Sequence, residues 1–238
     1  MEFSNSSTNS GIVERARTIA RVDATQWPTA NIVNSANDRL DKIMNYGITA
    51  DRKFQLDDSN HTKLPIGTTD LTAGQSDYSF LTDEQGNRII NITRVEVMDS
   101  DGIYTLLRPK DQQEIGEALD EFLKTDAPPL YYDKIADNII RLYPTPDETV
   151  SAGLKFYFQR TPSYFTASDT TKEPGFANEL HRGIVMQCAY DAAFTLGLQN
   201  AGELAMELER ENVVMREYFM NRNTDEIQNI KAVTRSSR

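Results

Sequence analysis

The chain has 238 residues, of which 39% are hydrophobic and 26% are charged, so it falls in the globular class with enough length for a substantial core. No apolar run approaches the roughly 18 residues that a membrane span needs, and a single cysteine excludes an intramolecular disulfide framework. The formal net charge of −11 disfavours a protein that wraps nucleic acid with its bulk surface, because Lys and Arg contacts to phosphates supply most of that affinity.

The N-terminal part predicts an arm followed by two helices. Residues 1–11 are rich in Ser and Asn and lack the basic and apolar stretches of a secretory signal, which predicts a flexible arm. Ile12 to Val22 predicts a short helix. From Pro28 to Tyr46, apolar residues recur at steps of three and four, which predicts a longer helix that ends at Gly47.

The helical period disappears between Asp51 and Ile89, where short apolar pieces alternate with Gly, Asp and Ser, as in short strands joined by long turns. Ile89 to Met98 predicts a half-buried strand that turns into a return strand over Tyr104 to Arg108. Pro109 is expected to end that pairing because proline has no backbone N–H. An amphipathic helix with an acidic outer face is predicted over Asp111 to Lys124.

Residues 130–165 are aromatic and carry proline just beyond predicted strand ends. Leu130 to Tyr132 begins a strand, Ile139 to Tyr143 returns antiparallel to it, and Leu154 to Arg160 forms another. Pairing is expected to stop at Pro144. The pattern is typical of structural architecture and not of a catalytic site.

The C-terminal part predicts two helices, Phe176 to Leu198 and Glu203 to Met220, packed as an antiparallel hairpin. Small residues in the first helix allow another helix to approach closely, and packing within the chain and packing between subunits both account for them. Beyond Asn221 the apolar stripe fades and basic residues outnumber acidic ones, which predicts a flexible basic tail over residues 223–238.

Together these patterns predict an α+β fold. Residues 12–50 and 176–222 are expected to form a helical bundle, into which an antiparallel β-rich domain is inserted at residues 51–175 with one amphipathic helix at 111–124.

No catalytic or metal-binding constellation stands out. The histidines, His61 and His181, have no partner at a metal-ligand spacing and are predicted to lie on the surface. Cys188 falls on an apolar helix stripe, where a buried structural thiol is the ordinary case. No glycine-rich phosphate loop is present. The sequence therefore predicts a protein that is not an enzyme and has no catalytic residue, metal or cofactor.

The segments Asn138 to Asp147 (NIIRLYPTPD) and Lys155 to Pro162 (KFYFQRTP), together with the order of elements, resemble the head-to-tail adaptor proteins of tailed bacteriophages. These proteins are also called connector or head-completion proteins. The resemblance covers approximately residues 12–222. It implies a structural virion protein at the head–tail junction, assembled in the host cytoplasm, whose dodecameric ring binds the portal and extends the DNA channel toward the tail.

The resemblance also implies partners and contact residues. The partners are the portal protein, a tail nozzle or tail-tube protein, further copies of the chain, and double-stranded DNA that passes without specific binding; no membrane is involved. The tail is implied to bind the portal, with candidate residues Ile227, Ile230, Lys231, Val233, Arg235 and Arg238. The helices are implied to make the subunit contacts, with candidates Gly183, Ala189, Ala193 and Gly197.

Carboxylates that line such a channel would repel DNA phosphates and let DNA slide without attachment. The candidate channel-lining residues are Glu203, Glu207, Glu209 and Glu211. A solvated outer helix face accounts for these glutamates equally well.

Two other functions remain open. One is a carbohydrate- or receptor-binding virion module in which exposed tyrosines of the β body stack against sugar faces. A long C-terminal helical hairpin with a basic tail is unusual in such a module. The other is a hydrolase that uses scattered Asp and Glu residues, and the lack of a nucleophile or metal constellation disfavours it.

Overall fold

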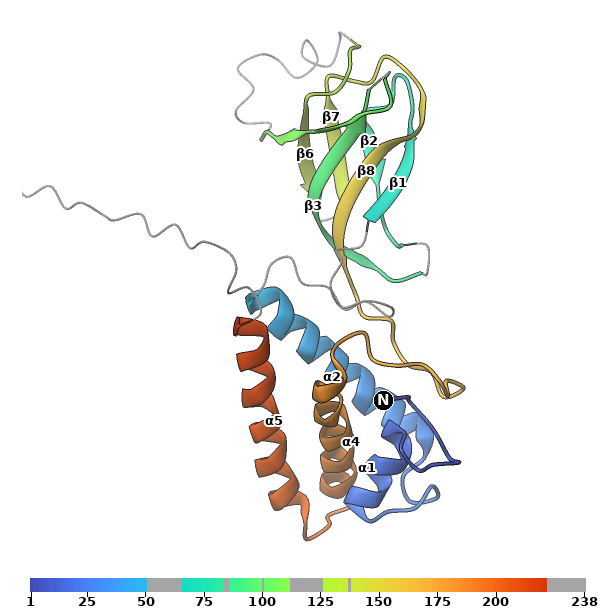
Figure 1. The fold of residues 1–238 in the computed structure, drawn as a ribbon, viewed down its shortest axis with the longest axis vertical. Helices are drawn as coiled ribbons and strands as arrows, with labels where there is room; N and C mark the ends of the chain where they lie inside the picture. The colour runs from blue at the N-terminus through green and yellow to red at the C-terminus, as the bar shows by residue number, and fades with distance from the viewer. Residues whose placement is uncertain (51–65, 84–85, 100, 112–125, 137, 222–238) are drawn as a thin grey trace, which may run out of the picture.

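The structure is a computed structural model of the chain, and it describes residues 1–238 except 51–65, 84–85, 100, 112–125, 137 and 222–238. The described part combines α-helices with two sheets of largely antiparallel strands, which confirms the α+β class (Figure 1). The helices are α1 (Ile12–Ala20), α2 (Thr29–Ala50), α4 (Arg182–Thr195) and α5 (Ala201–Asn221), with a short 3₁₀ helix η2 (Asn178–Leu180) before α4.

The α-helices share one apolar core. In α2, apolar side chains at three- and four-residue steps, Ile32, Ala36, Leu40 and Ile43, are buried along one face. They pack with buried side chains from α1, α4 and α5 in a single cluster. Because the contributing residues lie before position 44 and after position 164, the two ends of the chain build this core together.

The strands form two sheets. One has the order β1-β8-β3-β4 and the other β2-β7-β6-β5. The strand bounds are β1 (Ile66–Leu71), β2 (Asp77–Ser79), β3 (Ile89–Met98), β4 (Tyr104–Leu106), β5 (Arg108–Pro109), β6 (Tyr131–Ala136), β7 (Ile139–Tyr143) and β8 (Val150–Arg160). Both sheets contribute side chains to a second apolar core, which lies between them.

Strand β8 is central to the first sheet because it pairs with both β1 and β3. Its side chains alternate, and Leu154, Phe156 and Phe158 point into the core. The ring of Phe156 lies so close to β1 that a Cβ at Gly67 would approach it to 2.4 Å. Glycine at position 67 therefore allows the ring to pack against the strand.

Several strands confirm the predictions. Ile89–Met98 and Ile139–Tyr143 have the predicted bounds, and β8 begins four residues earlier than predicted. The prediction that Pro109 ends strand pairing is wrong, because Pro109 lies within β5, which pairs in parallel with β6. The amides on either side of it make the bonds: Arg108 donates to the Leu130 carbonyl (3.2 Å) and Lys110 to the Tyr132 carbonyl (2.9 Å). Pairing therefore does not need an N–H at Pro109.

The helix predictions hold for α2 and α5, with shifted ends. The predicted helix from Phe176 instead begins as η2, and α4 starts at Arg182. The His181 side chain gives a physical reason for the later start of the helix. Its Nε2 bonds the Phe176 carbonyl (2.8 Å) and so occupies a backbone acceptor that a helix starting at Phe176 would use. The predicted helix at Asp111 to Lys124 falls outside the described residues.

Residues 1–11, predicted as a flexible arm, are instead folded against the helices. The amides of Ile12 and Val13, at the start of α1, donate to the carbonyls of Glu2 (3.1 Å) and Phe3 (3.0 Å). The first turn of a helix has N–H groups without partners inside the helix, and the arm supplies acceptors for them. Phe3 is fully buried and stacks on Phe165, with ring centroids 4.6 Å apart. The polar composition of the segment concealed this single apolar anchor.

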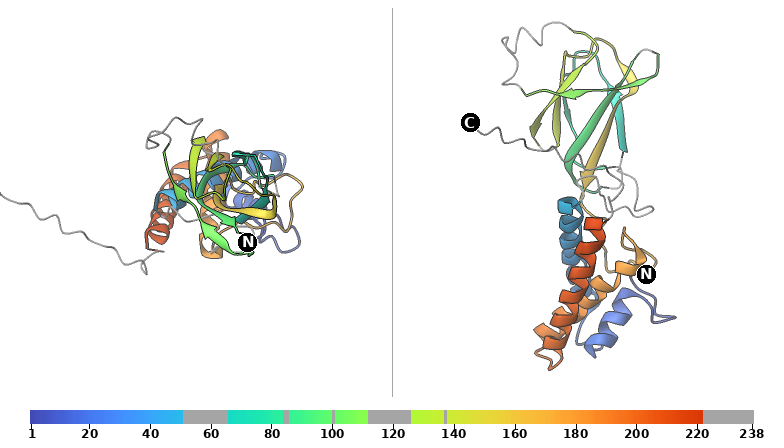
Figure 2. Two further views of the ribbon diagram at one scale, coloured as in Figure 1. Left: turned by 90° about the horizontal axis from the view of Figure 1, so that it is seen from above. Right: turned by 60° about the vertical axis from the view of Figure 1, so that its left-hand side comes forward.

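The molecule is elongated, with the sheets at one end and the helices at the other (Figure 2). The two apolar clusters share no residue. This arrangement fits an inserted β-rich domain at residues 51–175, and the domain division itself stays a prediction.

Candidate functional site

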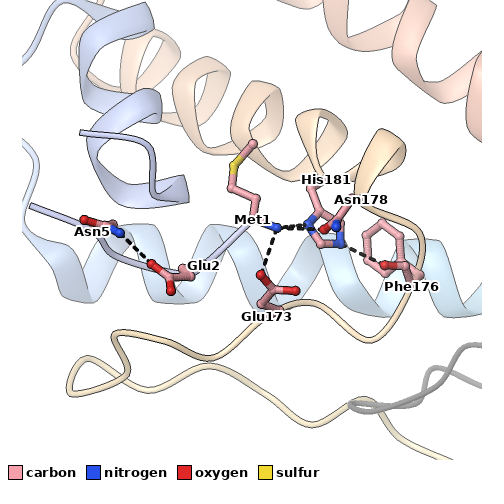
Figure 3. Close-up of polar contacts among 7 residues, drawn as sticks. All are labelled: Met1, Glu2, Asn5, Glu173, Phe176, Asn178 and His181. Atoms are coloured by element: carbon pink, nitrogen blue, oxygen red, sulfur yellow. Dashed lines mark hydrogen bonds and ion pairs between the residues drawn. The ribbon is translucent and has the colours of Figure 1, made fainter. Parts of the chain in front are cut away.

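His181, predicted to lie on the surface, is only 1% exposed. Its Nε2 lies 2.8 Å from the Phe176 carbonyl, which can only accept, so Nε2 carries the proton and Nδ1 is an acceptor. The amino group of Met1 donates to this Nδ1 (2.8 Å), to Asn178 Oδ1 (2.8 Å) and to Glu173 Oε1 (3.3 Å) (Figure 3). The imidazole thus fixes the N-terminal segment to the start of α4. His61 lies outside the described residues.

Cys188 is buried on α4, as predicted, and its thiol donates a weak hydrogen bond to the Ile32 carbonyl at 3.7 Å. Burial raises the pKa of the Cys188 thiol far above its usual range. A thiol that resists ionisation is a poor nucleophile. In the described part of the chain, no group of three or more His, Cys, Asp and Glu residues could hold a metal ion, and no helix is long and apolar enough to cross a lipid bilayer.

Three of the candidate channel-lining glutamates, Glu203, Glu207 and Glu211, follow one side of α5 at four-residue steps. Arg182 at the start of α4 donates from Nη2 to Glu207 Oε1 and from Nε to Glu211 Oε1, both at 2.9 Å. Arg210 also pairs with Glu207 at 2.9 Å. Two of these three carboxylates therefore have cationic partners within the chain, which weakens their negative field.

Glu209 points to a different side of α5, where it accepts a hydrogen bond from Asn212 Nδ2 (2.8 Å). Asn212 in turn accepts from Arg39 Nη1 at 2.6 Å. The candidate channel-lining residues thus do not form one continuous face. Glu209 instead compensates a buried cation through Asn212.

Arg39 of α2 is among the largest fully buried side chains of the protein. Its Nε and Nη2 atoms are buried without a hydrogen-bond partner among the described residues. Burial lowers the pKa of Arg39, and the guanidinium nevertheless keeps its proton. The sequence analysis missed this residue, although Arg39 lies three positions after Ala36 and so falls on the buried stripe of α2.

The candidate subunit-contact residues mostly lie inside the protomer. Gly183, Ala189 and Ala193 are buried in α4, and Gly197 is exposed after its C-terminal end. A Cβ at Gly183 would lie 3.0 Å from Met215 Cε and 3.2 Å from Arg39 Nη2. Packing within one chain therefore explains the small residues of α4, and their role between subunits stays a prediction.

The carbohydrate-binding alternative requires tyrosine rings of the β body whose faces are open to a sugar. Lys155 Nζ lies 4.9 Å from the ring centroid of Tyr104 and 5.5 Å from that of Tyr157, and Lys110 Nζ lies 4.9 Å from that of Tyr131. A sugar needs an open aromatic face for stacking. Because lysines of the same chain lie over these faces, the observed arrangement disfavours sugar stacking there.

The candidate portal-binding residues, Ile227, Ile230, Lys231, Val233, Arg235 and Arg238, lie outside the described residues, which end at Asn221 on the C-terminal side. Their role stays a prediction.

The comparison with protein families gives one match. The model described as SU10 adaptor protein matches residues 7–230, which include both the helices and the sheets. No curated protein matches the chain.

Proposed function

Since the chain belongs to the SU10 adaptor protein family and is thus a bacteriophage head-to-tail adaptor, we propose that its copies form a ring, by resemblance a dodecamer, between the portal and the tail. The observation that carries this proposal is the family match over residues 7–230. In this proposal residues 12–50 and 176–222 are the adaptor bundle, the β-rich insert faces a tail nozzle or tail-tube protein, and the chain catalyses no reaction.

The ring proposal is tested by electron microscopy of the protein mixed with portal rings of the same phage. The expected result is a second ring of density stacked on the portal, since adaptor copies would occupy equivalent positions around its symmetry axis. Portal rings that stay bare at micromolar adaptor concentrations would refute the proposal.

We further propose that residues 223–238 bind the portal. The segment combines Ile227, Ile230 and Val233 with Lys231, Arg235 and Arg238, so it offers both apolar and cationic contacts. Among the described residues, the last one in the helical core is Phe219, so deletion after Arg222 keeps every described core residue. The truncated protein is therefore expected to keep its melting temperature and to lose portal binding in co-sedimentation. Undiminished binding would exclude the tail as the portal contact.

A channel lined by carboxylates is the proposed path for DNA, supported by the formal net charge of −11. Glu203 is the best test position, because reversal at Glu207 or Glu211 would also break the ion pairs with Arg182. Phage that carry Glu203→Lys are expected to release DNA more slowly than phage that carry the neutral Glu203→Gln. Equal release rates would show that Glu203 does not line the channel.

A further inference from the structure

Helix α5 carries apolar side chains on two opposite faces. The inner face contributes Leu208, Met215 and Phe219 to the helical core. On the outer face Met206 is 63% exposed and Val213 is 44% exposed. Each of these two residues lies two positions before an inner residue, and two positions turn a helix by roughly 200°. The outer residues therefore point directly away from the core.

The outer apolar residues form a line along the helix. Met206, Val213 and Met220, which is 72% exposed, are separated by steps of seven residues. A seven-residue step returns to nearly the same side of an α-helix, with a drift of roughly 20°. We call these three residues the outer stripe. In Figures 1 and 2, α5 lies at the edge of the helices and its outer side faces no other described element.

A helix with apolar side chains on two faces is typical of a helix buried between two layers. One layer, formed by α2 and α4, is present in the chain. No element among the described residues forms the other layer. A narrow line of large side chains at seven-residue spacing fits a second helix that crosses at a small angle, because such a seam packs side chains into the gaps of a facing helix.

The charges beside the outer stripe indicate which partner supplies the missing layer. Exposed Glu209 and Arg216 flank it on one side, and exposed Glu203, Arg210 and Glu217 on the other. The first side is neutral and the second has one excess negative charge, although the chain as a whole has a net charge of −11. Two copies of so acidic a chain repel each other over most of their surfaces, and a band with both signs and little net charge reduces that repulsion.

We propose that the outer stripe of α5 packs against a second copy of the chain and forms the contact between neighbouring subunits. This inference rests on the proposed ring. Three side chains bury much less than the roughly 800 Å² per partner of a stable pairwise interface. The contact is therefore weak between two isolated copies, and ring closure on the portal, where each subunit has two neighbours, adds to it.

The test uses the full chain with Met206→Glu, Val213→Glu and Met220→Glu combined. The variant is expected to keep the wild-type circular dichroism spectrum and melting temperature, because all three side chains are exposed. Native mass spectrometry of complexes with portal rings should count a full ring for the wild type and only partial occupancy for the variant. A matched control places glutamate at three exposed apolar positions of the β-rich part, Ile66 in β1 and Leu81 and Ile103 in loops, and should form full rings.

The outcomes separate this inference from the proposed function. Full rings of the outer-stripe variant, or equal loss in the control, overturn the inference and leave the ring proposal intact. If the wild type does not bind portals, sedimentation of the adaptor alone at high concentration tests the contact between copies. Concentration-dependent association that is lost in the outer-stripe variant and kept in the control supports the inference without the portal role. A wild type that neither binds portals nor self-associates overturns both.

Discussion

Replacing Phe3 with alanine is expected to lower the free energy of unfolding by about 3–5 kcal/mol, the range for a buried phenylalanine. The ring is fully buried and stacks on Phe165 at a centroid distance of 4.6 Å. Its loss opens a cavity in the helical core and frees the arm that supplies acceptors to the first turn of α1. Urea denaturation followed by circular dichroism measures the change.

The matched control is Ser7→Ala, which alters the same segment at an exposed position and should change stability by less than about 0.5 kcal/mol. Phe3→Leu keeps most of the buried volume, so its loss of stability should lie between those of Phe3→Ala and Ser7→Ala. If Phe3→Ala changed the free energy of unfolding as little as the control does, residues 1–11 would not be docked in solution. The flexible arm predicted from their polar composition would then be correct.

Replacing Asn212 with alanine is expected to cost about 3 kcal/mol of stability, because it leaves a buried charge without compensation. Among the described residues, Asn212 Oδ1 is the one acceptor that the Arg39 guanidinium bonds, at 2.6 Å. In the described part of the chain, the Nε and Nη2 atoms of Arg39 already have no partner. The loss should appear as a lower midpoint of urea denaturation.

A double-mutant cycle isolates this effect. Arg39→Met removes the buried charge and keeps much of the side-chain volume, so it is expected to be neutral or stabilising. In that background Asn212→Ala should cost less than about 1 kcal/mol, since no buried cation remains to be left unpaired. Asn221→Ala, at an exposed position of the same helix, is the control. Equal costs of Asn212→Ala in both backgrounds would show that Asn212 does not compensate Arg39.

The hydrogen bond between Arg39 and Asn212 also links α2 to α5. Arg39 lies on α2, and Asn212 on α5 lies beside the outer-face position Val213. A loss of this hydrogen bond would loosen the helix that we propose as the subunit contact. Stability and assembly are therefore best measured on the same variants, so that a defect in ring formation is not mistaken for a defect in folding.

The elements that the sequence predicted well are those specified by local patterns. Ile89–Met98 alternates across a strand between turn residues, and α2 repeats its apolar residues at helical steps, so each pattern indicates the element and its buried face. The resemblance of residues 138–147 and 155–162 to adaptor proteins is confirmed by the family match. Both segments form paired strands with the expected order.

Pairings between distant residues were decided only by the tertiary structure. Arg39 and Asn212 are 173 positions apart, and the amino group of Met1 meets His181 across 180 positions. A periodic pattern shows that a side chain faces a core, yet it carries no information on which distant group lies opposite. The burial of Phe3 and His181 and the two-sided apolar character of α5 thus depend on how the chain ends pack together, because a hydrogen bond or a buried contact exists only where both partners are brought into place.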